Sequence, residues 1–93
     1  MNKNALTRVL EEASLHHDSP DCFELFHGKY TLFYSGSFYG YVYVTEDPDS
    51  DQNEHEYTWK SFDEMLDDTI DEIGKTWREV LEETPSNKIY IGW

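Results

Sequence analysis

The sequence predicts an α+β fold in a single small domain, and three observations lead to this prediction. Apolar residues recur at helical spacing in residues 3–15 and again from residue 62 to about 83. Between these segments, residues 22–45 are rich in aromatic and β-branched side chains and are divided by short turn signals, as strands are. The chain has 93 residues, which is enough for one modest core, so we expect residues 1–93 to form one domain.

Residues 3–15 should form the first helix. Its apolar face consists of Leu6, Val9, Leu10 and Ala13. The segment that follows, HHDSPD at 16–21, should end this helix, because Pro20 cannot continue a helix and Asp and Ser favour turns.

Residues 22–45 should form three antiparallel strands joined by short turns. The segments CFELFH and KYTLFYS flank His27 and Gly28, which suit a tight hairpin turn. The segment SGS at 35–37 marks the next turn, and FYGYVYVT follows as the third strand. Residues 57–60 and the C-terminal segment KIYIGW could each pair with this meander. These additions would extend the three-stranded sheet to four or five strands, of which the last would be a short C-terminal strand.

Alternation in the third strand separates two kinds of side chain. Phe38, Val42 and Val44 share one face, and the other face carries Tyr39, Tyr41 and Tyr43. This period of two is typical of a sheet with one face on the core and one face partly uncovered. We expect the tyrosines on the uncovered face, where they suit protein recognition. The alternative is that the N-terminal helix covers them and they only pack there.

The segment from residue 62 to about 83 should form a long acidic amphipathic helix. Ser61 suits its N-cap and Glu64 completes a capping box, while Thr76 and Glu79 form a second capping box just after Gly74. Two readings therefore stay open, one helix or two helices broken at Gly74. We favour one helix because its apolar stripe stays in phase across the glycine. The stripe consists of Phe62, Leu66, Ile70, Ile73, Trp77, Val80 and Leu81.

The charge disfavours several classes of binding partner. The net charge is −13, with 20 acidic residues against seven basic ones, so direct binding to nucleic acid or to anionic membranes is disfavoured. No apolar run approaches the roughly 20 residues that a membrane span requires, and the N-terminus lacks the apolar region of a secretory signal. Cys22 is the lone cysteine, which fits a reducing compartment. We expect a cytoplasmic protein that is complete from Met1 to Trp93.

No motif indicates a metal, a cofactor or a catalytic site. Asp47, Asp49 and Asp51 alternate as in the first half of a calcium-binding loop, but Gln52 and Thr58 stand where that loop needs Gly and Glu. The histidines are scattered, without the paired spacing of zinc ligands, and the glycines are isolated rather than gathered in a phosphate loop. With so many carboxylates, no single pair stands out as a general acid and base. We therefore expect a protein that is not an enzyme.

Carboxylates are concentrated in residues 46–72, which hold 12 of the 20 acidic residues and a single base, Lys60. On a helix starting at residue 62, six of them would lie opposite the apolar stripe: Asp63, Glu64, Asp67, Asp68, Asp71 and Glu72. Like charges one turn apart destabilise a helix by a few tenths of a kcal/mol per pair, so this acidity exceeds what solvation requires. About one carboxylate per 3 Å of helix also approaches the phosphate spacing of DNA, roughly 3.4 Å.

A short, acidic, aromatic α+β chain of one domain resembles, in general character, phage-encoded inhibitors such as anti-CRISPR proteins and the toxin-immunity proteins. This resemblance implies a stoichiometric inhibitor that mimics nucleic acid and occupies the basic cleft of a nuclease or other nucleic-acid-binding protein. The candidate partner-binding residues are Tyr39, Tyr41, Tyr43, Asp47, Asp49, Asp51, Asp63, Glu64, Asp67, Asp68, Asp71 and Glu72. The alternative is a cytoplasmic adaptor or structural module whose acidity serves only solubility.

Overall fold

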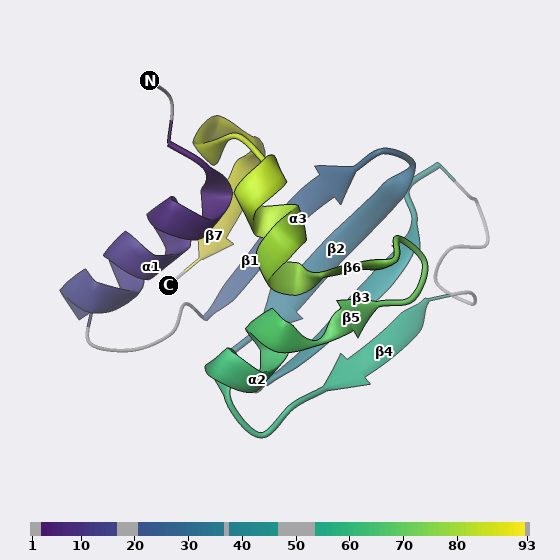
Figure 1. The fold of residues 1–93 in the computed structure, drawn as a ribbon, viewed down its shortest axis with the longest axis horizontal. Coiled ribbons are helices and arrows are strands. Elements are labelled where there is room, and N and C mark those ends of the chain that lie inside the picture. Colours follow the sequence, from purple (N-terminus) through teal and green to yellow (C-terminus); the bar gives the residue numbers. More distant parts are fainter. Residues whose placement is uncertain (1–2, 17–20, 37, 47–53, 93) are drawn as a thin grey trace.

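A five-stranded antiparallel sheet forms the centre of the fold; in Figure 1 the C-terminal helix crosses in front of the sheet and the N-terminal helix lies beside its left edge. The structure is a computed structural model that describes residues 3–16, 21–36, 38–46 and 54–92. In spatial order the strands are β4 (His55–Thr58), β3 (Tyr39–Val44), β2 (Tyr30–Ser35), β1 (Cys22–His27) and β7 (Ile89–Gly92). The meander predicted from the sequence is therefore confirmed, and the C-terminal segment joins it as an edge strand. The other edge strand, β4, begins two residues before the predicted segment 57–60 and ends at Thr58.

Turn chemistry and register explain the first hairpin. Strands β1 and β2 pair from Cys22 with Ser35 to His27 with Tyr30, which leaves Gly28 as the first turn residue. Gly28 has φ of 60°, a left-handed value that a two-residue hairpin turn needs and that glycine adopts without strain. The turn therefore lies one position later than the sequence indicated.

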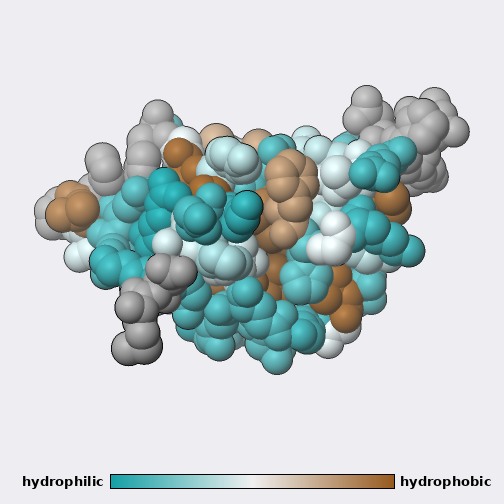
Figure 2. Space-filling view, turned by 90° about the horizontal axis from the view of Figure 1, so that it is seen from above, coloured by the Kyte–Doolittle hydropathy of each residue, from teal (hydrophilic) through white to brown (hydrophobic). Residues whose placement is uncertain are grey.

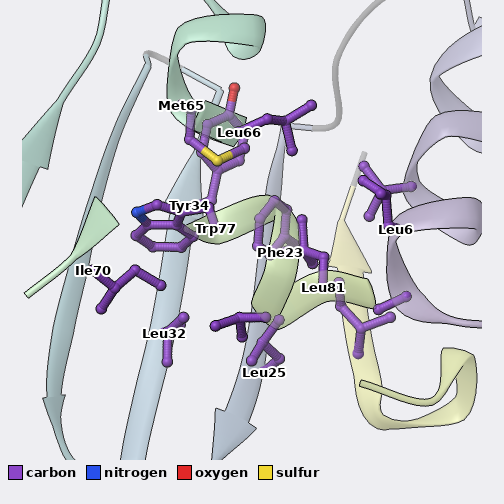
Figure 3. Packing of buried hydrophobic residues seen from close by; sticks show 14 of the residues in the cluster. Leu6, Phe23, Leu25, Leu32, Tyr34, Met65, Leu66, Ile70, Trp77 and Leu81 are labelled. Atoms are coloured by element: carbon purple, nitrogen blue, oxygen red, sulfur yellow. The ribbon is translucent and has the colours of Figure 1, made fainter. Parts of the chain in front are cut away.

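Apolar side chains from one face of the sheet pack against the helices and form the core (Figure 3). The helical elements are α1 (Ala5–His16), α2 (Phe62–Asp67), α3 (Trp77–Glu83) and the 3₁₀ turn η1 (Ser86–Lys88). On this inner face Phe23, Leu32 and Tyr34 are fully buried, and the ring of Trp77 packs edge-on against Phe23 at 6.4 Å between centroids. Helix α1 packs against α3 and η1, so Leu10, which the sequence placed on its apolar face, remains 44% exposed.

The prediction of one long helix from residue 62 to about 83 is wrong. Helix α2 ends at Asp67, and the chain then forms a small hairpin of β5 (Thr69–Ile70) and β6 (Lys75–Thr76) before α3 begins. The alternative break at Gly74 was closer, but the interruption is a hairpin that starts several residues earlier. The residues of the apolar stripe still reach the core, because the hairpin turns Ile70 inward as a helix would.

Local chemistry explains why the hairpin replaces the helix. Gly74 has φ of 80°, and its amide donates to the carbonyl of Ile70 at 2.7 Å to close the turn. Thr76 then caps α3 in a complete capping box with Glu79, a signal that belongs at a helix start and not in a helix interior. The hairpin also moves Asp71 away from Asp67, which removes like-charge neighbours that a continuous helix would have placed one turn apart.

The dimensions are those of one small globular unit. The Cα radius of gyration is 12.6 Å, close to the roughly 12 Å expected for a folded chain of this length. Within the ranges that the structure describes, no helix combines the length and the apolar character that crossing a membrane requires.

Candidate interaction surfaces

The outer face of the sheet, opposite the helices, carries a group of aromatic side chains that we call the aromatic face. Its members come from four strands: Phe26, Phe33, Tyr39, Tyr41, Tyr43 and Tyr90. Tyr90 is 64% exposed and Phe26 is 48% exposed. In the described part of the chain all three α-helices contribute to the core on the inner face, so no described helix covers these rings.

Strand register arranges the aromatic face into contacting pairs. Phe33 on β2 lies opposite Tyr41 on β3, and their rings stack with centroids 5.9 Å apart. Tyr39 packs edge-on against Tyr41 at 4.7 Å. A hollow of about 240 Å³ opens beside these rings, lined by Phe33, Tyr41, Tyr43 and two carboxylates, Glu24 and Glu54. The face is thus a rigid aromatic platform with acidic groups at its border.

Electrostatics make this border distinctly negative. Burial raises the pKa of the Tyr41 hydroxyl, and the carboxylates of Glu54 and Glu56 raise it further. Tyr41 therefore keeps its proton at neutral pH and can donate a hydrogen bond, while the neighbouring carboxylates attract cations. In the space-filling view from above, hydrophilic side chains cover much of the visible surface of the molecule (Figure 2).

A second surface, which we call the acidic hollow, lies beside the sheet edge formed by β4. It has a volume of about 470 Å³ and is lined by Thr58, Trp59, Glu64, Asp67 and Asp68. The indole nitrogen of Trp59 donates to a carboxylate oxygen of Asp68 at 2.8 Å, and the amide of Lys60 donates to Glu64.

Asp67 differs from the other acids of the hollow, because it pairs across space with Arg78 on α3. The guanidinium of Arg78 lies 3.3 Å from the carboxylate of Asp67, whose side chain is 73% exposed. An exposed pair of this kind contributes little stability and can be exchanged for a contact with another cation. The hollow therefore keeps carboxylate oxygens accessible to solvent.

Glu72 and Asp71 belong to a different environment, the turn of the β5–β6 hairpin. The hydroxyl of Tyr57 donates to Glu72 at 2.9 Å and accepts from the backbone amide of Asp71 at 3.1 Å. The Nδ1 atom of His55 lies 2.8 Å from the same Glu72 oxygen. Burial first, and then the Glu72 carboxylate, raises the pKa of Tyr57 well above its ordinary value. Glu72 thus connects the hairpin to β4, a structural role.

The continuous acidic stripe expected on a long helix is therefore not formed. Helix α2 has six residues, about 9 Å, so the phosphate-like spacing over a longer helix is absent as well. The structure gathers Glu64, Asp67 and Asp68 around the acidic hollow and leaves Asp63 exposed on the first turn of α2. The remaining candidates Asp47, Asp49 and Asp51 lie outside the described residues.

Sequence reasoning missed part of the aromatic face. Phe26, Phe33 and Tyr90 lie on it, as do the carboxylates of Glu24 and Glu56. Alternation within each strand was a usable signal for which residues share a face. Only the strand order, with β7 placed beside β1, shows that Tyr90 lies opposite Glu24 on the same surface.

Among the described residues, no group of three or more His, Cys, Asp or Glu side chains is arranged to hold a metal ion. Comparison with protein-family models, with curated proteins and with solved structures gives no match. The surfaces themselves are therefore the basis for a proposal of function.

Proposed function

We propose that this protein is a non-enzymatic binding protein whose partner is a basic protein. The observation that supports this proposal most strongly is the aromatic face, which no described helix covers and which carries carboxylates at its border. Solvation of a sheet face does not require six aromatic rings, and Tyr is enriched at the energetic centres of protein interfaces. The border carboxylates would orient a basic partner and speed its approach.

The size of the aromatic face indicates how the partner would dock. The aromatic face consists of six residues. Each partner in a standard interface contributes about 800 Å² of accessible surface, or roughly 20–30 residues. The footprint would therefore extend beyond the rings onto the acidic border, which favours a positively charged partner over a neutral one.

Within this class we favour a stoichiometric inhibitor or immunity-type protein that occupies the basic cleft of a nuclease or other nucleic-acid-binding protein. Such clefts are lined with Lys and Arg because they bind phosphates. An acidic surface with aromatic anchors competes for the same cleft by matching its charge and by stacking on its side chains. The carboxylates would contribute to encounter rate and register, and the tyrosines to residence time.

A second candidate, an adaptor whose acidity serves solubility, has one observation in its favour. Glu72 and Asp68 are hydrogen-bonded inside the protein, so part of the acidity has a structural role. This reading predicts that no particular group of exposed carboxylates matters for binding.

The test compares two variants that lose the same charge at different places. The aromatic-face variant carries Glu24→Gln, Glu54→Gln and Glu56→Gln. The control variant carries Glu11→Gln, Glu82→Gln and Glu83→Gln on α1 and α3, which lie on the other side of the sheet. Each is used to capture proteins from the organism that encodes this chain, and captured proteins are identified by mass spectrometry.

The proposal predicts that the native protein and the control variant capture the same basic protein, and that the aromatic-face variant loses it. Equal capture by both variants would instead support the adaptor reading, in which the charge acts only through solubility. Capture of an acidic or neutral protein as the main partner, unaffected by either variant, would contradict the proposal.

A further inference from the structure

The two edges of the sheet differ in the hydrogen bonds that the rest of the chain makes to their backbone. At the β7 edge, Arg8 of α1 donates from Nη1 to the carbonyl of Ile89 at 3.1 Å and to the carbonyl of Ser86 at 2.8 Å. The carbonyl of Ile89 is thus satisfied from within the protein. Neither β7 nor β4 pairs with a further strand within the described residues, but at β4 no described side chain hydrogen-bonds to the backbone on the side away from β3. We call this side of β4 the free edge.

Backbone geometry identifies which groups the free edge presents. The amide of Trp59 donates to the carbonyl of Phe38 at 2.8 Å, toward β3. Because backbone groups alternate in direction along a strand, Tyr57 also faces β3, whereas the amides and carbonyls of Glu56 and Thr58 face outward. The free edge therefore presents two donors and two acceptors in the pattern that an added strand requires.

Negative side chains flank the free edge on both sides of the sheet. On the outer side, Glu56 lies opposite Tyr41 and belongs to the border of the aromatic face. On the inner side lies the acidic hollow, with Glu64 and Asp67 among its lining residues and Thr58 of β4 at its wall. The side chains of an added strand would alternate between these two surfaces, so both rows would meet carboxylates.

We infer that the free edge of β4 accepts an extended segment of a basic partner, which adds a sixth strand and places Lys or Arg side chains in the acidic hollow. This inference rests on the proposed function and specifies the conformation of the partner segment. Strand β4 has four residues and spans about 13 Å, which suits a segment of similar length. Backbone hydrogen bonds would give affinity, and alternate side chains would give specificity.

Charge argues against a second copy of this chain as the occupant. Each copy carries a net charge of −13, and edge-to-edge pairing would bring the carboxylates around both β4 strands together. Charged side chains at an exposed edge commonly prevent such self-association. The same charges select for a segment of opposite sign.

The test is amide hydrogen exchange by NMR on the intact protein, with two octapeptides as probes. Both peptides alternate arginine and threonine and are blocked at their ends. One of them is N-methylated at every second residue, so that the amides along one edge of this peptide cannot donate hydrogen bonds. In the free protein the amides of Glu56 and Thr58 should exchange about tenfold faster than that of Tyr57. The unmodified peptide should slow Glu56 and Thr58 by about tenfold, and the methylated peptide should not.

A variant of the protein gives an independent readout. Thr58→Pro removes one outward donor while leaving the face toward β3 unchanged, since proline is tolerated at an edge position of this kind. It should abolish the slowing of Glu56 by the unmodified peptide. Equal effects of the two peptides, no effect of either, or slow exchange of Glu56 and Thr58 in the free protein would each overturn the inference. The capture experiment with charge variants judges the proposed function separately.

Discussion

Removal of the Tyr57 hydroxyl tests the hairpin that replaces the expected long helix. In the structure this hydroxyl donates to Glu72 at 2.9 Å and accepts from the Asp71 amide at 3.1 Å. In a continuous helix the Asp71 amide would instead bond to the carbonyl four residues earlier, and the hydroxyl would lose this donor. Tyr57→Phe therefore perturbs the hairpin and leaves the buried ring in place.

The size of the effect follows from the two hydrogen bonds. A bond to a charged group contributes about 1.5–3 kcal/mol, and a neutral one about 0.5–1.5 kcal/mol. The bond from the Asp71 amide is only partly buried, and His55 still contacts Glu72, so we expect less than the full value of both bonds. We expect Tyr57→Phe to lower the free energy of unfolding by about 2 kcal/mol, which corresponds to a fall in Tm of roughly 10 °C for a domain of this size.

Urea denaturation followed by Trp fluorescence measures this change, with Tyr41→Phe as the matched control. Among the described residues no hydrogen bond to the Tyr41 hydroxyl is present, so the control should change stability by less than about 0.5 kcal/mol. A double-mutant cycle with Glu72→Gln should give a coupling energy of at least about 1 kcal/mol. A loss below about 0.5 kcal/mol for Tyr57→Phe, or no coupling, would refute the contact between β4 and the hairpin.

Two further predictions concern other parts of the fold. Gly40→Ala should destabilise the protein by about 2 kcal/mol in urea denaturation. The Cβ of the new alanine would lie 2.5 Å from the carbonyl oxygen of Phe33 and 3.1 Å from the ring of Trp59. An unchanged denaturation midpoint would show that the packing around Gly40 is looser than in the structure. Hydrogen bonds from the amide and hydroxyl of Thr76 lower the pKa of Glu79. Its ionised form therefore stabilises the fold above the unfolded pKa, and this stabilisation is lost as the pH falls through the lower folded pKa. The stability difference between the native protein and Glu79→Gln should shrink on acidification from neutral pH, and a difference that grows would contradict the capping box.

The strands were predictable from the sequence because their signals are local. Alternation and turn residues identify β1, β2 and β3 without any knowledge of tertiary contacts. The hairpin was not predictable from periodicity, because Ile70 is buried whether the chain is helical or extended there. The capping box of Thr76 was the local signal that contradicted one helix, and the left-handed Gly74 agrees with it. The capping-box residues and the glycine are both visible in the sequence, but the apolar stripe, which stays in phase across Gly74, favoured one helix.

The candidate surfaces were predictable only in part, because strand order is a property of the whole fold. Alternation alone placed Tyr39, Tyr41 and Tyr43 on one face. That Tyr90 joins them follows from the pairing of β7 with β1, which no local pattern encodes. Likewise, the hydrogen bond between Tyr57 and Glu72 joins residues 15 positions apart and turns an expected surface acid into a structural one.

The salt dependence of partner binding tests the central claim most directly. The measurement is the Kd of the captured protein for the native chain and for the aromatic-face variant, by titration calorimetry from about 50 to about 500 mM NaCl. The account predicts that the native complex weakens at least about tenfold over this range, and that the variant binds more weakly with a shallower salt dependence. A native Kd that does not change with salt, or a variant that binds as tightly as the native chain, would contradict it.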